Sequence, residues 1–440
     1  MTQTPYLNAL EDRLSKVAIS APRPRGVLSR VTGMLLSARG IRAPLGAYCE
    51  VMSEDGEPIV CEVVGFKDQE VMLMPLGSVQ GLLPGAAVGV LTHTARVGVS
   101  TQMLGRVIDG MGQPFDGGPP IAPEVFVPLR GERKNPLERA AIKEPLDVGI
   151  RSINTFLTVG KGQRIGLIAG SGVGKSVLLG MMTRFTQADV IVIGMIGERG
   201  REVLDFVHDT LGPEGLKRAV VIASPGDCSP VIRLRATHLS CAVAEYFRDR
   251  GKNVLLLLDS MTRVAHAQRE VGLAVGEPPT TKGYTPSVFS LINEIIERAG
   301  SLASGGSITG FYTVLAEGDD YNDPIVDGAR AILDGHVMLS RELAATGQYP
   351  AVDISDSISR LANRLIGPDQ RQLVTRYRRL LSTYEDNRDL VSVGAYREGA
   401  DPELDEAIRR RAAMRDFLMQ DLDEQVTLGQ AFNQLATVMK

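Results

Sequence analysis

The sequence predicts a three-part protein: a small β-rich domain, a central α/β domain on a parallel sheet, and a helical carboxyl-terminal domain. Three observations support this prediction. Short β-branched runs crowd residues 21–92, near-continuous apolar runs alternate with helical sequence over 93–375, and charged helical sequence fills 376–440. Because apolar strands between helices are typical of a parallel sheet covered on both faces, the central part is expected to form the main core.

Length and composition restrict the class of protein. A chain of 440 residues exceeds one ordinary hydrophobic core, so two or three domains are expected. The formal net charge of -4 provides no basic field, which argues against nucleic acid as the main partner. The cysteines have no metal-binding spacing, and we expect reduced thiols in the cytoplasm. They are Cys49, Cys61, Cys228 and Cys241.

Residues 1–20 are predicted to be a partner-binding extension. Leu7, Leu10, Leu14 and Val17 recur at spacings of three and four, which predicts an amphipathic helix over residues 3–19. A free helix of this length is marginal in water, so it needs a covering surface, either a partner or its own domain. The segment lacks the apolar region of a secretory signal. No apolar run approaches the ~18 residues of a membrane span, so membrane association is expected only through partners.

The β-rich domain, residues 21–92, is predicted to be a small antiparallel barrel or sandwich. Its β-branched runs are Val27–Leu36, Cys61–Phe66 and Val71–Pro75. Glycine and proline clusters separate these runs, as expected for short strands joined by turns. Nothing in this domain resembles a catalytic motif.

In the central domain, residues 93–375, five apolar runs are predicted to be strands. They are Arg164–Ala169, Val190–Ile196, Ala219–Ala223, Val254–Leu258 and Ile308–Leu315. In the carboxyl-terminal domain, residues 376–440, apolar positions at helical spacing predict a helix over Ala407–Leu422.

The strongest functional signal is a glycine-rich loop between a predicted strand and a helix-compatible run. It reads Ala169, Gly170, Ser171, Gly172, Val173, Gly174, Lys175, Ser176, and Val177 opens the following helix. This is the strand–loop–helix context of a phosphate-binding P-loop, although Ala169 stands where the standard pattern opens with glycine. Backbone N–H groups of such a loop turn toward phosphate oxygens, and the helix N-terminus adds its dipole.

The chemistry of a P-loop assigns roles to these residues. Lys175 is predicted to reach the β- and γ-phosphates of ATP, and the Ser176 hydroxyl to bind Mg²⁺. Asp259, directly after the apolar run Val254–Leu258, has the position of a Walker B acid that orients the metal's water shell. Glu198 follows another strand and is predicted to polarise the attacking water. We prefer it to Glu202 because it lies nearer the strand end.

Several longer motifs point to one family. The segments AGSGVGKS, GERGRE, LLLLDSMTRVAHAQRE, GEPPTTKGYTPSVFS, YTVLAEGDD, ILDGH and QYPAVDISDSISR closely resemble the export ATPases of flagella and type III secretion injectisomes. Those ATPases are relatives of the catalytic subunit of the F-type ATP synthase. The resemblance runs from about Gly26 to the carboxyl terminus.

The resemblance implies a fold and a set of partners. It implies a β-barrel domain, a RecA-like P-loop ATPase domain and a helical domain, assembled as a homohexamer with sites between neighbours. It further implies a stator-like regulatory dimer at the N-terminus, a coiled-coil stalk protein at the carboxyl-terminal face, and contacts with an export gate and chaperone–substrate complexes. The expected location is the cytoplasm, peripheral to the inner-membrane export apparatus through these partners.

The resemblance also implies further site residues. Arg199 in GER and Arg263 in DSMTR are expected near the γ-phosphate. Tyr349 matches the aromatic position that packs on adenine. Arg360, at the end of SISR, matches the position that reaches into the neighbour's site as an arginine finger.

Alternatives remain open at this point. The flagellar branch is favoured over a virulence injectisome by the stretches GFYTVLAEGDDYNDPIVDGARAILDGH and LVSVGAYREGADPELDEAI. An ATP synthase catalytic subunit is disfavoured because its loop normally ends in threonine. A Rho-like RNA translocase is disfavoured because the N-terminal domain lacks aromatics interleaved with basic residues. A non-catalytic subunit need not keep Lys175, Glu198, Asp259 and Arg360 together.

Overall fold

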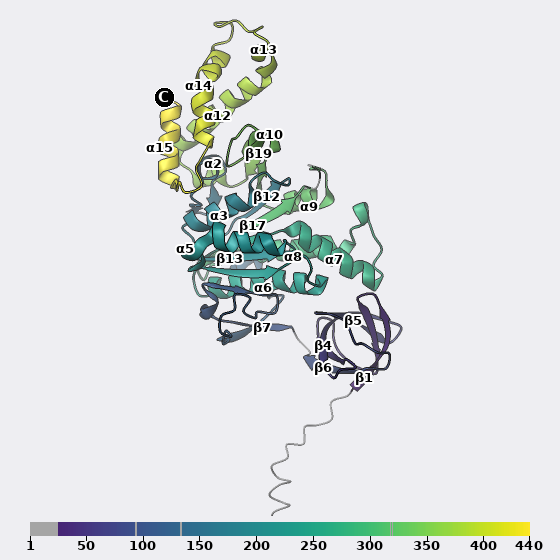
Figure 1. Cartoon of the computed structure of the whole chain (residues 1–440). Helices are drawn as coiled ribbons and strands as arrows, with labels where there is room; N and C mark the ends of the chain where they lie inside the picture. The colour runs from purple at the N-terminus through teal and green to yellow at the C-terminus, as the bar shows by residue number, and fades with distance from the viewer. Residues whose placement is uncertain (1–24, 93–94, 133, 317, 319) are drawn as a thin grey trace, which may run out of the picture. The chain divides into compact units, whose positions relative to one another are not determined.

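The computed structural model describes residues 25–92, 95–132, 134–316, 318 and 320–440. The chain divides into two compact units, one ending at Thr94 and one running from Ala95 to Lys440 (Figure 1). The helix expected over residues 3–19 lies outside the described residues. Within the described ranges, no helix is both long enough and apolar enough to cross a membrane.

The first unit is a closed six-stranded barrel, in the order β1-β2-β5-β4-β3-β6. Its strands are β1 (Arg25–Thr32), β2 (Leu35–Arg39), β3 (Tyr48–Met52), β4 (Pro58–Lys67), β5 (Glu70–Pro75) and β6 (Ala87–Thr92). Pairing of β1 with β6 closes the barrel, which removes the free sheet edges. The interior is apolar, with Leu28, Leu36, Leu73 and Val88 almost fully buried. The predicted barrel domain is therefore present.

One strand prediction in the barrel is wrong. The run Val27–Leu36 was expected to be a single strand, but it contains the turn between β1 and β2. Gly33 has a φ of 58°, in the left-handed region that glycine adopts at little cost, so the chain reverses there.

The second unit is built on a nine-stranded sheet, in the order β19-β18-β12-β17-β15-β13-β14-β8, with β16 paired to β17. The parallel strands are β8 (Arg106–Ile108), β12 (Arg164–Ala169), β13 (Val190–Ile196), β14 (Ala219–Ser224), β15 (Asn253–Asp259), β17 (Ser307–Leu315) and β18 (Gly335–Leu339). β19 (Val352–Ser359) runs antiparallel at the edge, and β16 spans Gly300–Ser301. All five predicted strands are present.

Helices cover both faces of this sheet, which explains why its strands are apolar throughout. Alternate residues of β13 face opposite sides: Ile191 and Ile193 belong to one buried cluster, Val190 and Val192 to the other. The first cluster includes α2 (Arg151–Phe156) and α3 (Lys175–Phe185). The second includes α6 (Pro230–Arg248), α7 (Met261–Val275), α8 (Pro286–Glu297) and α9 (Pro324–Ile332).

Short elements complete the central domain. The strands are β7 (Arg96–Val99), β9 (Val125–Pro128), β10 (Pro145–Leu146) and β11 (Val159–Gly160). The helical segments are η1 (Thr101–Met103), η2 (Pro136–Glu138), α4 (Gly200–Asp205), the π-helix η3 (Phe206–Leu211), α5 (Gly212–Leu216), η4 (Thr281–Gly283), α10 (Arg341–Ala345) and α11 (Ala362–Leu365).

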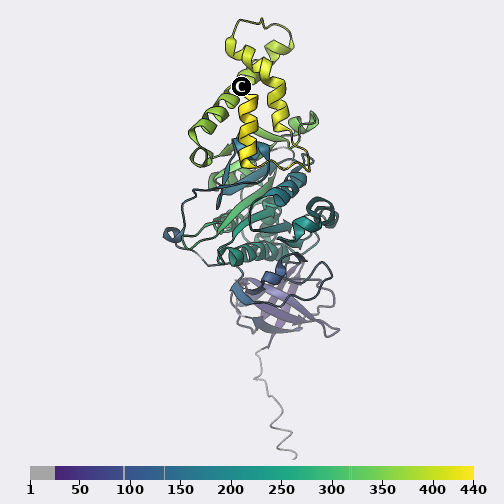
Figure 2. The ribbon, with the colours of Figure 1, turned by 90° about the vertical axis from the view of Figure 1, so that its left-hand side faces the viewer.

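The carboxyl-terminal helices gather at one end of this unit (Figure 2). They are α12 (Pro368–Asp386), α13 (Arg388–Ser392), α14 (Pro402–Leu418) and α15 (Leu428–Val438). The helix predicted over Ala407–Leu422 is shifted, because Asp401 caps α14 by accepting from the backbone N–H groups of Glu403 and Leu404. Pro402 then occupies the first helical turn, where its missing N–H costs nothing.

Arg151 on α2 joins the sheet domain to these helices. Its side chain is almost buried. Its Nε donates to Gln434 Oε1 at 2.7 Å, and its Nη1 donates to the carbonyl oxygens of Met419 at 2.5 Å and Phe417 at 3.2 Å. Its Nη2 also pairs with the Glu424 carboxylate. One buried cation thus satisfies four acceptors of the last two helices and of the loop between them.

Replacing Arg151 by methionine should therefore destabilise this unit. The change leaves buried acceptors without donors, which costs about 3 kcal/mol. We expect a lower urea midpoint by circular dichroism. As a control, Lys217→Ala breaks the exposed ion pair with Glu214 and should change stability by no more than about 0.5 kcal/mol. Equal midpoints for the two variants would contradict this role of Arg151.

Candidate active site

The glycine-rich loop joins the end of β12 to the start of α3. Gly172 and Gly174 have φ values of 79° and 88°, a backbone region that other L-residues rarely adopt. Gly174 is the N-cap of α3, so the first N–H groups of that helix point out of the loop toward an incoming anion. Val173 is buried in the core beneath the loop and holds it in place. The loop therefore has the features of a phosphate cradle.

The predicted nucleotide-binding residues differ in exposure. Ser171, Gly172, Ser176 and Val177 are exposed, Lys175 and Gly174 are half-buried, and Gly170 and Val173 are buried. The two buried residues can contribute only backbone groups, whereas the Ser176 side chain is open to a ligand.

Lys175 lies between two carboxylates at the carboxyl edge of the sheet. Its Nζ hydrogen bonds to Asp259 Oδ1 and lies 3.7 Å from Glu198 Oε1. Thr313 on β17 donates its hydroxyl to the same Asp259 oxygen at 2.7 Å. These groups meet because β12, β13, β15 and β17 are parallel neighbours. The structure thus brings Lys175, Glu198 and Asp259 together, as the sequence predicts.

Glu198 has an unusual electrostatic environment. Burial raises its pKa to about 7; the Lys175 charge opposes this increase, while Asp259 and Glu202 add to it. Glu198 Oε1 is buried and accepts no hydrogen bond from the described residues. A carboxyl group that titrates near neutral pH and has an unused acceptor is suited to hold a water molecule or a proton.

The arginines of the neighbouring segments lie beside this cluster. Arg263 stands in the first turn of α7, and a side-chain carbon at Gly197 would lie 2.8 Å from its Cβ. Gly197 therefore provides the room in which the Arg263 stem lies. Arg199 is the N-cap of α4, and its side chain is 88% exposed and 3.9 Å from Glu202. Arg199 is thus free to turn toward a ligand.

Tyr349 lies on the far side of the loop. A side-chain carbon at Gly174 would lie 3.4 Å from its ring, and the Tyr349 side chain is 45% exposed. Its carbonyl accepts from the backbone N–H of Gln420 at 2.9 Å, which ties this segment to the end of α14. The ring is therefore available as a flat surface beside the cradle.

Arg360 is the one predicted site residue that its own chain does not bring to the site. β19 runs antiparallel to β18, so Arg360 emerges at the amino edge of the sheet. Its N–H donates to the carbonyl of Asp334 at 2.9 Å, and its side chain is exposed. The six residues of β12 separate the two edges by roughly 17 Å, at ~3.3 Å per residue.

Two residues near the cluster were missed by the sequence analysis. Thr313 is a polar residue within a largely apolar strand, which was a signal that its hydroxyl has a buried hydrogen-bond partner. Arg341 lies two residues after the end of β18, and its Nη2 donates to the Ser171 carbonyl at 3.4 Å. A basic residue at the carboxyl end of a parallel strand was a usable signal for Arg341.

Comparison with known protein families supports this picture. Residues 28–89 match the β-barrel domain of the ATP synthase alpha/beta family, and residues 149–359 match the nucleotide-binding domain of that family. Residues 366–437 match the carboxyl-terminal domain of the type III secretion ATPase EscN.

Curated relatives are similar over nearly the whole chain. A flagellum-specific ATP synthase of Pseudomonas aeruginosa is 53% identical, covering 100% of this chain and 98% of its own. That of Salmonella typhimurium is 52% identical, covering 96% and 95%. A type 3 secretion system ATPase of Xanthomonas euvesicatoria is 46% identical, covering 96% of each chain.

The fold also matches a solved structure. The assembled ATPase EscN of the enteropathogenic E. coli type III secretion system has a TM-score of 0.90 and 39% identity, covering 94% of this chain and all of that one. Fold, site geometry and full-length similarity agree: the chain belongs to the family of flagellar and type III secretion ATPases and is an ATP-hydrolysing enzyme of protein export, with the flagellar branch favoured.

Proposed function

We propose that this chain is the motor subunit of a flagellar protein export apparatus and that its active site is shared between two copies. The observation that carries the shared site is the location of Arg360. It is exposed at the edge of the sheet opposite the phosphate loop, too far away for one side chain to span. A second copy that presents its amino edge to this carboxyl edge would supply the arginine.

In the proposed mechanism, Lys175 exchanges its carboxylate partner for phosphate oxygens when ATP binds. The backbone N–H groups of the loop and the first turn of α3 hold the phosphates. Ser176 and Asp259 would hold Mg²⁺, which when bound neutralises charge on the phosphates. The exposed Ser176 hydroxyl and the buried acid fit the oxygen ligands that this ion prefers. Glu198 then orients the attacking water and accepts its proton.

The remaining assigned residues act around the phosphates. Arg199 and Arg263 stabilise charge on the γ-phosphate, and Tyr349 packs on the adenine ring. Arg360 of the neighbouring copy stabilises the charge that develops during transfer. The four segments 1–20, 21–92, 93–375 and 376–440 would serve as partner extension, barrel, motor and coupling domain.

Homologous assemblies support the proposed partners. EscN has been solved as an assembled ATPase and in complex with its central stalk EscO; in the latter structure the TM-score is 0.87 at 38% identity. By analogy we propose a homohexamer with a coiled-coil stalk at its carboxyl-terminal face. A regulatory dimer at the N-terminus, an export gate and chaperone–substrate complexes would place it at the cytoplasmic face of the inner membrane.

The pH dependence of catalysis tests the role of Glu198. Below about pH 7 its carboxyl is protonated and cannot accept the proton of water, so kcat/KM should fall about tenfold per pH unit. Because Glu202 contributes to the raised pKa, Glu202→Gln should move this acid limb to lower pH while preserving the plateau rate. If Glu202→Gln instead abolishes turnover, Glu202 is the carboxylate that accepts the proton of water and our assignment of Glu198 is wrong.

Mixed assemblies test the shared site. Arg360→Ala should leave ATP binding nearly intact and lower hydrolysis by about 10³-fold. Mixing it with Glu198→Gln subunits should restore part of the activity, because some interfaces then combine an intact Glu198 with an intact Arg360. Hydrolysis by isolated monomers at a rate independent of protein concentration would contradict a shared site.

Replacing Lys175 by alanine in the host tests the export role. The change removes the cation that holds the phosphates, so ATP hydrolysis should be lost. We expect the host to lose flagellar filaments, seen by electron microscopy, while any injectisome secretion continues. Normal filaments together with lost effector secretion would transfer the chain to the injectisome branch, which the 46% identity to the Xanthomonas ATPase keeps as the second candidate.

A further inference from the structure

The backbone around Arg360 is held more firmly than its exposed side chain. Among the described residues, the guanidinium makes one hydrogen bond, from Nη2 to the carbonyl of Arg330 at 3.2 Å. The Arg360 N–H, in contrast, donates to Asp334 at 2.9 Å. The preceding Ser359 hydroxyl donates to the Thr158 carbonyl at 3.0 Å and accepts from Gln163 Nε2 at 3.1 Å. The Arg360 side chain is thus exposed, whereas hydrogen bonds fix the backbone that carries it.

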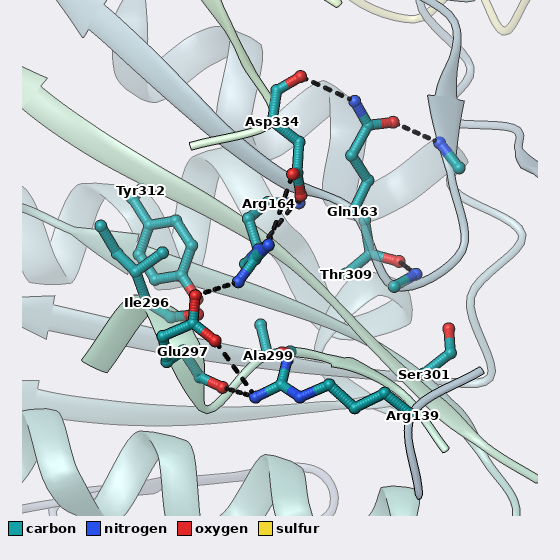
Figure 3. Close-up of polar contacts among 12 residues, drawn as sticks. Arg139, Gln163, Arg164, Ile296, Glu297, Ala299, Ser301, Thr309, Tyr312 and Asp334 are labelled. Carbon is teal, nitrogen blue, oxygen red and sulfur yellow. Dashed lines mark hydrogen bonds and ion pairs between the residues drawn. The ribbon is translucent and has the colours of Figure 1, made fainter. Parts of the chain in front are cut away.

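Asp334 connects the backbone at Arg360 to β12 (Figure 3). Its carbonyl, besides accepting from Arg360, accepts from Gln163 Nε2 at 3.3 Å. Its carboxylate accepts from the backbone N–H and the Nε of Arg164, each at 3.1 Å, and from Arg164 Nη2 at 3.4 Å. Gln163, just before β12, and Arg164, its first residue, therefore both bind Asp334, which in turn accepts from the Arg360 backbone N–H.

Ion pairs extend this set of contacts from Arg164 to the neighbouring helix α8. Arg164 Nη1 pairs with Glu297 at the end of α8, and Glu297 pairs with Arg139 at 3.3 Å (Figure 3). Arg139 Nη1 also donates to the Ala299 carbonyl at 2.9 Å. The result is a row of alternating charges along the amino edge of the sheet. It lies at the edge opposite Lys175, so it cannot contact ATP bound by its own chain.

A fixed backbone matters because an arginine that acts across an interface must place its guanidinium at a defined position in the neighbouring active site. A displacement of about 1 Å can cost on the order of 100-fold in rate. Since the Arg360 side chain is exposed, its neighbours in the chain do little to orient it. The position of the Arg360 guanidinium must then be set mainly by the Arg360 backbone.

From these contacts we infer that Asp334, held by Arg164 and Gln163, is a positioning residue for Arg360 in hydrolysis by the adjacent copy. The inference rests on the proposed shared site. Asp334 does not contact the substrate. It fixes the position of the Arg360 backbone, from which the side chain extends.

The test is Asp334→Asn in the full-length chain. The amide keeps the size of the side chain but weakens the charged pair with Arg164. We expect kcat to fall about 10- to 100-fold, with KM for ATP within about twofold. In an Arg360→Ala background the same change should cause no further loss, because the residue it positions is gone. An additional loss of the same size in that background, or a rise in KM with unchanged kcat, would overturn the inference.

Asp116→Asn is a matched control. The Arg106–Asp116 pair is also bidentate, with side-chain exposures of 18% and 23%, against 20% and 23% for Arg164–Asp334. It lies in the same unit but not next to Arg360. A fall in kcat as large as that of Asp334→Asn would show that any broken pair of this kind slows the enzyme, and would overturn the inference.

Mixed assemblies add a readout that a purely structural role would not change. Asp334→Asn subunits should regain activity when mixed with Glu198→Gln subunits, and should gain none from Arg360→Ala subunits. If Asp334→Asn fails to fold by circular dichroism, Ser359→Ala, which removes the two hydrogen bonds of the Ser359 hydroxyl beside Arg360, should give a smaller fall in kcat with the same pattern. Full activity of Arg360→Ala would refute the shared site, whereas inactive Arg360→Ala with a normal Asp334→Asn refutes only the positioning role.

Discussion

The parallel hydrogen-bond register of β12, β17, β15 and β13 is the constraint on which the rest of this structure depends. It brings the ends of strands that are far apart in the sequence to one edge of the sheet. Lys175, Asp259 and Glu198 can meet there only because their strands start and stop in step. The same register fixes the opposite edge, where Asp334 and Arg360 lie. The two ends of one sheet thus carry the two halves of the proposed chemistry.

At the carboxyl edge, one cation faces two acids. Lys175 pairs closely with Asp259, which leaves Glu198 with a distant partner and an unused acceptor. Burying a carboxylate without full compensation is costly, and the increase in the pKa of Glu198 reflects that cost. Such an arrangement opposes stability and favours ligand binding, as is common where a protein keeps a site ready for charged substrates. The large buried clusters on both faces of the sheet compensate for this cost.

The sequence predicted the strands and the meeting of Lys175 with Asp259 and Glu198, but not the turns, the helix caps or the partners of several single polar residues. The strands Arg164–Ala169 and Val190–Ile196 were correct to the residue because a short, continuous apolar run between helices is typical of a strand buried on both faces. The β1–β2 turn and the start of α14 were missed because Gly33 and Asp401 act through backbone angles and capping bonds that hydrophobic patterns do not show. Thr313, Arg341 and Asp334 escaped notice because each acts through a partner more than fifty residues away or on another strand. The motif predicts Arg360 as a site residue, and the antiparallel course of β19 places it at the amino edge of the sheet, which the motif does not show.

β12 carries the phosphate loop at one end and the residues that grip Asp334 at the other. This has a consequence for the evolution of the chain. Surface loops can gain or lose residues because their ends stay in place. Loss of one residue within β12 would shift one end of the strand by about 3.3 Å and would move its side chains from one helix-covered face of the sheet to the other. The spacing between Gln163 and Gly170 should therefore stay constant among descendants of this gene, even where the chemistry of individual side chains drifts.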